Sequence, residues 1–254
     1  MTSWTGCGVD VMNGLVVGVV ALPLLAGTLV AVMALRRAHP STVHRLTLMA
    51  TGLTALCALA LLPHIEDGPA ITVEWLPGAG PMGLTTGATG LYAVLVTAWG
   101  AFLVLLGTTS RSAEYPPLSG AVTLLALAAT NVAFLTDHFL ARYVALEVVA
   151  LCIALALLVE VRNSAGIRLA RSSYLLLRLG DAGLLTAILI LREASGTLNI
   201  GPALELVLSS TEGLALSSIE GAGGALNAAR LGWVVAGFVL AVWVKLGGWP
   251  FHFW

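Results

Sequence analysis

Charged residues are scarce in this chain of 254 residues: they make up 10% of the sequence, whereas hydrophobic residues make up 58%. Soluble domains average about 25% charged residues, so the composition argues against an ordinary soluble protein. The same numbers exclude intrinsic disorder and a coiled coil. The formal net charge is −1, and no basic surface indicates a nucleic-acid partner. We expect the lipid bilayer to surround most of the chain.

Cysteine is also rare, with only Cys7, Cys57 and Cys152 in the sequence. Their spacing matches neither a disulfide framework nor a zinc site, so we expect small apolar side chains in packed surroundings. The sequence also lacks a glycine-rich nucleotide loop, iron–sulfur ligands and a recognisable Ser/His/Asp arrangement. We therefore expect no cofactor, no metal and no catalytic centre within the chain, and leave open whether it is part of an enzyme complex.

Long apolar segments dominate the sequence. Their lengths predict an all-α polytopic membrane protein with about six full transmembrane helices and the first half of a broken seventh. The predicted segments are Gly14–Leu35, Leu46–Leu62, Leu84–Gly107, Leu118–Leu135, Phe139–Val159, Ser173–Leu191 and Leu231–Gly248. The first is not a signal peptide, because no Lys or Arg precedes it and it exceeds the usual length of a signal core.

Arginines are unevenly divided between the two sides of the predicted bundle. Seven fall in odd-numbered loops: Arg36, Arg37, Arg45, Arg111, Arg162, Arg168 and Arg171. Three fall in the opposite loops: Arg142, Arg192 and Arg230. Since positive residues favour the cytoplasmic side, we predict a multi-pass protein of the cell (inner) membrane with its N-terminus outside.

Two of the predicted outside loops are long. Residues 63–83 combine prolines and glycines with the β-prone run Ile71–Trp75, which predicts a turn-rich hairpin. Residues 193–230 contain apolar stretches that we expect to lie along the membrane interface. Four histidines fall in or beside loops and are expected to be solvated: His39, His44, His64 and His138.

Four ionisable residues lie within the predicted crossings: Glu147, Arg178, Asp181 and Lys245. A charge at the bilayer centre costs about 2.5–3.5 kcal/mol on insertion scales, and packing alone does not require one. Glu147 lies about 12 Å along its helix from Phe139. It is either a paired structural carboxylate or part of an ion path, and the second interpretation is favoured.

Lys245 is the only lysine in the chain. It lies well inside the last crossing, too deep for an ordinary snorkelling side chain. A lysine in apolar surroundings can lose its proton, whereas an arginine stays protonated. The residue type therefore indicates a proton carrier.

Arg178 and Asp181 are three residues apart and share one face of their helix. They could neutralise each other as a structural pair, or Asp181 could exchange partners with Glu147 or Lys245. Both interpretations can hold together.

Helix-breaking residues directly follow Lys245. Gly247, Gly248 and Pro250 interrupt the seventh helix, and broken helices in membranes occur within protein or beside hydrated cavities. His252 lies beyond the break and either relays protons or only packs.

Several of these segments resemble one known family, the antiporter-like proton-pumping subunits of respiratory NADH:quinone oxidoreductase. LLLRLGDAG at 175–183 is similar to the Arg-x-Gly-Asp stretch of that family's sixth helix, and KLGGWPFHFW at 245–254 is similar to the signature of its broken seventh helix. SGTLNI at 195–200 and VEWLPGAG at 73–80 also look familial. Related subunits occur in multisubunit cation/proton antiporters, membrane-bound hydrogenases and inorganic-carbon uptake complexes.

The resemblance implies a fold of two inverted five-helix repeats, of which this chain carries a part. Residues 1–110 would form three leading helices, and residues 111–254 the first part of the ion-translocating repeat. It also implies that Glu147 and Lys245 form a proton half-channel with Asp181 nearby. One departure is Leu146, where the family often has tryptophan.

The chain ends at Trp254, within the implied ion site. The sequence is therefore either a fragment or one half of a split subunit whose partner chain supplies the second repeat. The resemblance also implies other membrane subunits as partners.

Two functions are weighed. The first is a proton- or sodium-translocating integral subunit of a larger energy-coupling complex. The alternative is a non-conducting anchor for a soluble catalytic partner. Lys245 favours the first, because an anchor has no need of a lysine within the membrane beside a helix break.

Overall fold

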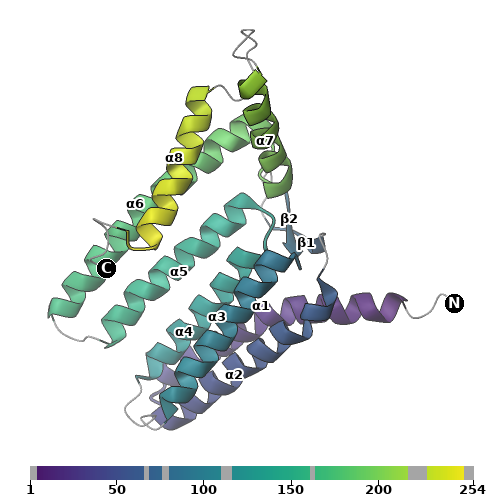
Figure 1. The fold of residues 1–254 in the computed structure, drawn as a ribbon. Coiled ribbons are helices and arrows are strands. Elements are labelled where there is room, and N and C mark those ends of the chain that lie inside the picture. The colour runs from purple at the N-terminus through teal and green to yellow at the C-terminus, as the bar shows by residue number, and fades with distance from the viewer. Residues whose placement is uncertain are drawn as a thin grey trace.

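The computed structural model describes residues 5–65, 69–75, 80–109, 116–160, 164–216 and 228–248 (Figure 1). The elements, in chain order, are α1 (Thr5–Leu35), α2 (Pro40–Ala60), the 3-10 helix η1 (Leu62–His64), β1 (Pro69–Glu74), β2 (Pro81–Thr85), α3 (Ala88–Gly107), α4 (Pro117–Leu135), α5 (Phe139–Glu160), α6 (Ser164–Ser195), α7 (Ile200–Leu216) and α8 (Ala228–Lys245). Within the described residues, the six helices α1 to α6 are long and apolar enough to cross a membrane. The prediction of an all-helical polytopic membrane protein is confirmed.

The helices form two neighbouring regions (Figure 1). Helices α1, α2, α3 and α4 make a leading bundle in which α1 packs against both α2 and α4. Helix α5 packs on α4 from one side and on α6 from the other, and α8 packs along α6. The chain thus passes from the leading bundle through α5 into a second layer of α5, α6 and α8.

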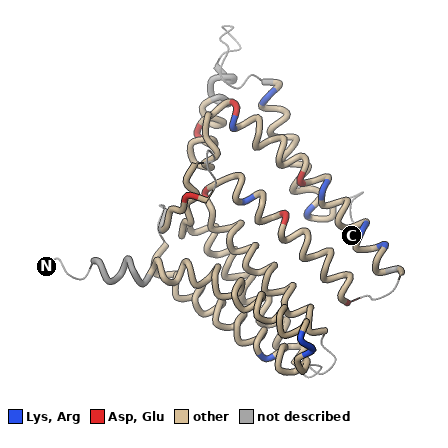
Figure 2. The backbone as a smooth tube through the Cα atoms, turned by 180° about the vertical axis from the view of Figure 1, so that it is seen from behind, with Lys and Arg blue, Asp and Glu red and all other residues tan. Residues whose placement is uncertain are grey.

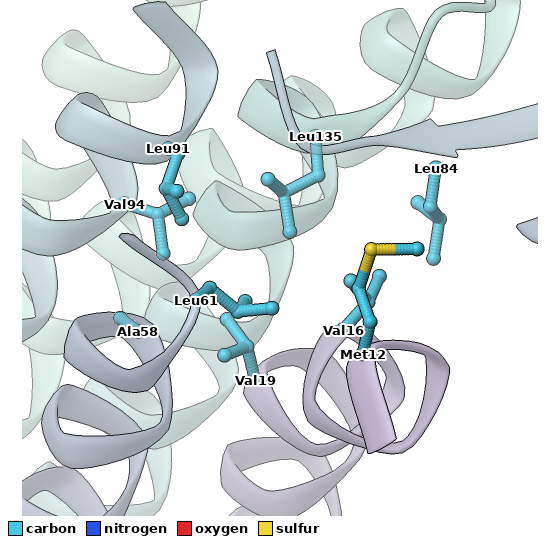
Figure 3. Close-up of a cluster of buried hydrophobic side chains, with 9 residues drawn as sticks. All are labelled: Met12, Val16, Val19, Ala58, Leu61, Leu84, Leu91, Val94 and Leu135. Carbon is cyan, nitrogen blue, oxygen red and sulfur yellow. The ribbon is translucent and has the colours of Figure 1, made fainter. Parts of the chain in front are cut away.

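One of the apolar clusters in the leading bundle lies toward the end where the β-hairpin sits. Figure 3 shows its buried side chains, which include Val16 and Val19 of α1, Leu91 of α3 and Leu135 at the end of α4. Leu84 of β2 also packs into this cluster. The β1–β2 hairpin therefore contributes a side chain to the apolar packing of the bundle.

The predicted hairpin is present. Strands β1 and β2 pair antiparallel, with Ile71 opposite Leu84 and Val73 opposite Met82. The Asp137 carboxylate accepts a hydrogen bond from the Gly83 N–H at 2.7 Å. A Cβ on Gly83 would lie 2.5 Å from the Asp137 carboxylate, so glycine allows the hairpin to reach the α4–α5 junction.

Several predicted boundaries were wrong. Helix α3 begins at Ala88 and not at Leu84, because Leu84 pairs in β2. Helix α2 begins at Pro40, since proline fits the first helical turn, and α6 begins at Ser164. The boundaries were misplaced because charged residues were assigned to loops. Arg45, Arg168 and Arg171 lie on helices, and near a helix end a long arginine side chain can extend to the interface. Part of the segment 193–230 folds as α7.

The prediction that the histidines are solvated was wrong for two of them. His44 and His138 are fully buried. The Nδ1 atom of His138 accepts a hydrogen bond from the Ala141 N–H at 3.3 Å, and its ring meets Trp75 edge-on. His138 therefore caps the first turn of α5, a role in which a side-chain acceptor satisfies a free backbone donor.

Candidate functional site

The four ionisable residues singled out from the sequence meet where α5, α6 and α8 pack together. Glu147 comes from α5, Arg178 and Asp181 come from α6, and Lys245 is the last residue of α8. Figure 2 shows acidic and basic positions partway along α5 and α6. The fold thus brings together residues up to about a hundred positions apart in the sequence.

Two ion pairs connect the three helices. The Arg178 guanidinium contacts the Glu147 carboxylate, and Lys245 Nζ lies 2.6 Å from Asp181 Oδ1. Arg178 pairs with Glu147 and not with Asp181, its neighbour on the same helix. Glu147 and Lys245 therefore have different partners, and both partners are on α6.

The two pairs are unequally buried. The Asp181 side chain is 1% exposed and that of its partner Lys245 is 25% exposed. The Glu147 side chain is 11% exposed and Arg178 is 39% exposed. Asp181 Oδ2 is buried without a hydrogen-bond partner among the described residues. Since removing one partner of a buried pair leaves an uncompensated charge, Asp181 depends strongly on Lys245.

Arg178 is held from its own helix as well as from α5. Its Nε donates a hydrogen bond to Tyr174 Oη at 2.8 Å, and its guanidinium carbon lies 4.9 Å from the Tyr174 ring centroid. The two residues are one helical turn apart, where side chains on a helix are neighbours. Tyr174 thus fixes the direction of Arg178 toward Glu147.

Close contact between α6 and α8 brings Lys245 to Asp181. A Cβ on Gly237 would lie 2.5 Å from the backbone oxygen of Gly183, and a Cβ on Gly180 would lie 3.1 Å from Val244. Small residues at helix interfaces let membrane helices approach closely. The glycines on either side of Asp181 therefore have a geometric role.

The end of α8 places Lys245 at a favourable electrostatic position. Gly247 has a φ of 66°, and its N–H donates to Val244 O while the Gly248 N–H donates to Trp243 O. These bonds form a Schellman cap. The free carbonyls at a helix C-terminus favour a nearby cation, which here is the Lys245 ammonium. Pro250 and His252 lie outside the described residues.

A cavity of about 360 Å³ lies next to Lys245 between α5, α6 and α8. Its walls are mostly apolar, and Arg142 and Tyr143 of α5 also line it. The sequence analysis placed Arg142 in a loop, but it lies in the first turns of α5, and its Nη2 donates to Thr136 O at 2.9 Å. Arg142 and Tyr143 precede Glu147 by roughly one helical turn. That spacing is the sequence feature that could have identified them as residues of this site.

The architecture is that of a polytopic membrane protein with ion pairs inside its helical layer. Residues 136–254 match the family described as NADH:quinone oxidoreductase/Mrp antiporter, TM. The resemblance found in the sequence is confirmed for this segment.

Many solved structures share the fold, including the following three. The membrane-bound sulfane sulfur reductase, an archaeal respiratory membrane complex, aligns over 94% of this chain and 46% of its own, with 19% identity and a TM-score of 0.72. Respiratory complex I from Thermus thermophilus aligns over 93% and 45%, with 19% identity and a TM-score of 0.65. The Mrp complex from Dietzia sp. DQ12-45-1b aligns over 95% and 42%, with 21% identity and a TM-score of 0.67. The chain thus spans less than half the length of these similar chains, and a comparison with curated proteins found no match.

Proposed function

We infer that this chain is a proton-translocating membrane subunit of a larger energy-coupling complex. The observation that carries this proposal is the pair of ion pairs arranged in series: Glu147 with Arg178, and Asp181 with Lys245. Arg178 and Asp181 are joined by one turn of α6, so the four charges alternate in sign across three helices. We assign these residues to one half-channel.

Lys245 and Asp181 are the proposed exchange point. Transfer of a proton from the Lys245 ammonium to the Asp181 carboxylate converts an ion pair into a neutral amine and a neutral acid. Apolar surroundings penalise separated charge, so the neutral pair is accessible there. Arg178 keeps its charge throughout and holds the Glu147 carboxylate in place.

A lysine in the path favours the proton over sodium as the transported ion. An ammonium repels a metal cation, whereas it can itself carry and release a proton. The helix break at Gly247 and Gly248 is proposed to let Lys245 move relative to Asp181 without unwinding α8.

The other half of the path is proposed to come from further membrane segments. The similar chains are more than twice as long as the aligned part, and all three belong to complexes. We propose other membrane subunits as partners. The second repeat would come from one of these or from further sequence of the same polypeptide.

Flux measurements on the assembled complex in proteoliposomes test this function. Asp181→Asn should lower proton flux about 100-fold, the order expected for loss of a positioned proton-transfer group. Glu193→Gln is the matched control, because it removes one carboxylate from the exposed Arg230–Glu193 pair, and it should leave flux unchanged. A properly assembled Asp181→Asn complex with normal flux would support the alternative, a non-conducting anchor.

A further inference from the structure

An apolar groove of about 710 Å³ runs over the leading bundle, and none of the ion-paired residues lines it. It is lined by α1, α2 and α3, with Met49 and Leu53 of α2 largely exposed beside it. Trp99 of α3 also lines it, and the Trp99 and Phe102 rings meet edge-on at 5.8 Å. The groove offers no charged or hydrogen-bonding side chain except the indole of Trp99.

The length and the position of the groove fit one acyl chain. Its lining on α2 extends from Leu46 to Leu56, a rise of about 15 Å. This equals half of a bilayer hydrocarbon core about 30 Å thick, which is the depth of one leaflet. The groove begins at the end of α2 that follows the α1–α2 turn.

Three arginines lie at that end of the groove. Arg45 precedes Met49 by four residues, so both lie on the same face of α2. Arg36 and Arg37 occupy the turn after α1, and all three side chains are exposed. None of the three forms an ion pair with a described acidic residue. Figure 2 shows this basic end of the α1–α2 hairpin.

Arg37 occupies a position that usually requires glycine. Its φ is 59°, while the Ala38 N–H donates to Met33 O and the Arg37 N–H donates to Ala34 O. These bonds make a Schellman turn, in which glycine is the preferred residue at the left-handed position. An arginine held in this uncommon conformation indicates a use for its side chain.

We propose that this groove binds an anionic phospholipid. One acyl chain lies between α1, α2 and α3 against Trp99, and the phosphate headgroup is held by Arg45 with Arg36 and Arg37. Basic clusters at the membrane surface recognise anionic headgroups. The apolar groove contacts the acyl chain, and a zwitterionic lipid with the same chain would make that contact equally well. Preference for the anionic lipid therefore comes from the arginines and occupancy from the groove.

Fluorescence quenching by phospholipids with brominated acyl chains tests the site. The full chain in its assembled complex is titrated with brominated phosphatidylglycerol or brominated phosphatidylcholine of identical chains. The contribution of Trp99 is the difference between the native protein and Trp99→Phe. Phosphatidylglycerol should quench Trp99 at a several-fold lower mole fraction than phosphatidylcholine.

Two charge variants and one groove variant separate the contributions. Arg45→Gln should reduce the preference for phosphatidylglycerol about fivefold. Arg37→Gly should also reduce it, although glycine suits the turn better, so misfolding cannot account for the loss. Ala26→Leu fills the groove with a larger apolar side chain and should weaken quenching by both lipids. Arg192→Gln, at the far end of α6, is the charge-matched control and should change nothing.

Three results would overturn the proposal. Equal quenching of Trp99 by the two lipids would mean that the arginines only orient the protein in the membrane. Absence of quenching by either lipid would mean that a partner helix covers the groove. A preference that survives Arg45→Gln and Arg37→Gly unchanged would place the headgroup elsewhere.

Discussion

The leading bundle and the α5–α6–α8 layer solve the burial of polar groups in different ways. In the leading bundle, Thr47 donates to Val43 O at 2.9 Å, and Asn131 donates to Val19 O at 2.9 Å. Both side chains are neutral and each donates to a backbone carbonyl, while Asn131 Oδ1 is buried without a hydrogen-bond partner among the described residues. In the second layer, Asp181 is 1% exposed and depends on a lysine from another helix.

This difference distinguishes polar side chains that bond to the backbone within the bundle from charged side chains that we assign to ion translocation. A threonine bonded to its own helix adds little cost in a membrane, so its presence needs no further explanation. A carboxylate paired across helices costs more and is sensitive to any movement of its partner. The two regions have similar apolar helices, so the charges of the second layer are not required to build a bundle.

Replacing Lys245 should produce the largest difference between the two regions. Lys245→Ala removes the charge, whereas Lys245→Arg keeps it but prevents deprotonation. If the lysine carries protons, both variants should lose about 100-fold in proton flux in proteoliposomes, with assembly verified by co-purification. Near-normal flux in the arginine variant would show that only the positive charge matters.

Two matched glycines should separate packing from transport. A Cβ on Gly237 would lie 2.5 Å from the Gly183 oxygen, and one on Gly90 would lie 2.5 Å from the Phe134 oxygen. Both alanine variants should destabilise the protein by about 1–3 kcal/mol in thermal unfolding. Only Gly237→Ala should lower flux per folded complex, because it separates α8 from α6. Equal flux in both variants would contradict the proposed geometry.

Coupling between Glu147 and Lys245 is expected to pass through the two α6 residues. A double-mutant cycle of Glu147→Gln and Lys245→Ala on transport rate should give a coupling energy of about 1 kcal/mol or more. Asn131→Leu combined with Lys245→Ala is the control from the leading bundle and should be additive within about 0.5 kcal/mol. Additivity in the first cycle would show that the two ion pairs act independently.

Orientation is the one property that we expect both regions to share. Arg36 and Arg37 lie at the end of α1, and Arg168 lies in the first turns of α6, so the positive-inside rule gives both ends the same side. A cysteine at position 168 should react with a membrane-impermeant thiol reagent only at background level in intact cells. Cysteine at position 192 is the opposite-side control, and strong labelling at 168 would reverse the predicted topology.

The sequence alone identified the helices and the charged residues, for a physical reason. A crossing must satisfy its backbone hydrogen bonds internally, so a long apolar run indicates a helix whatever it packs against. Charges stand out equally well within such a run, and Glu147, Arg178, Asp181 and Lys245 were visible without any tertiary information. Boundaries were less certain, because Arg45, Arg168 and Arg171 are tolerated on helix ends by extending outward.

Tertiary structure decided which charge meets which. Spacing on α6 favoured a local Arg178–Asp181 pair as much as exchange with other helices, since both residues share one face. Because α8 approaches α6 closely at Gly183 and Gly237, Asp181 pairs with Lys245. Arg178 pairs instead with Glu147 on α5. Burial of His44 and His138 was likewise a matter of packing, because a histidine beside a loop has no sequence signal that separates a solvated ring from a helix cap. Composition and periodicity specify what enters the membrane, and only contacts between distant helices specify how its charges are paired.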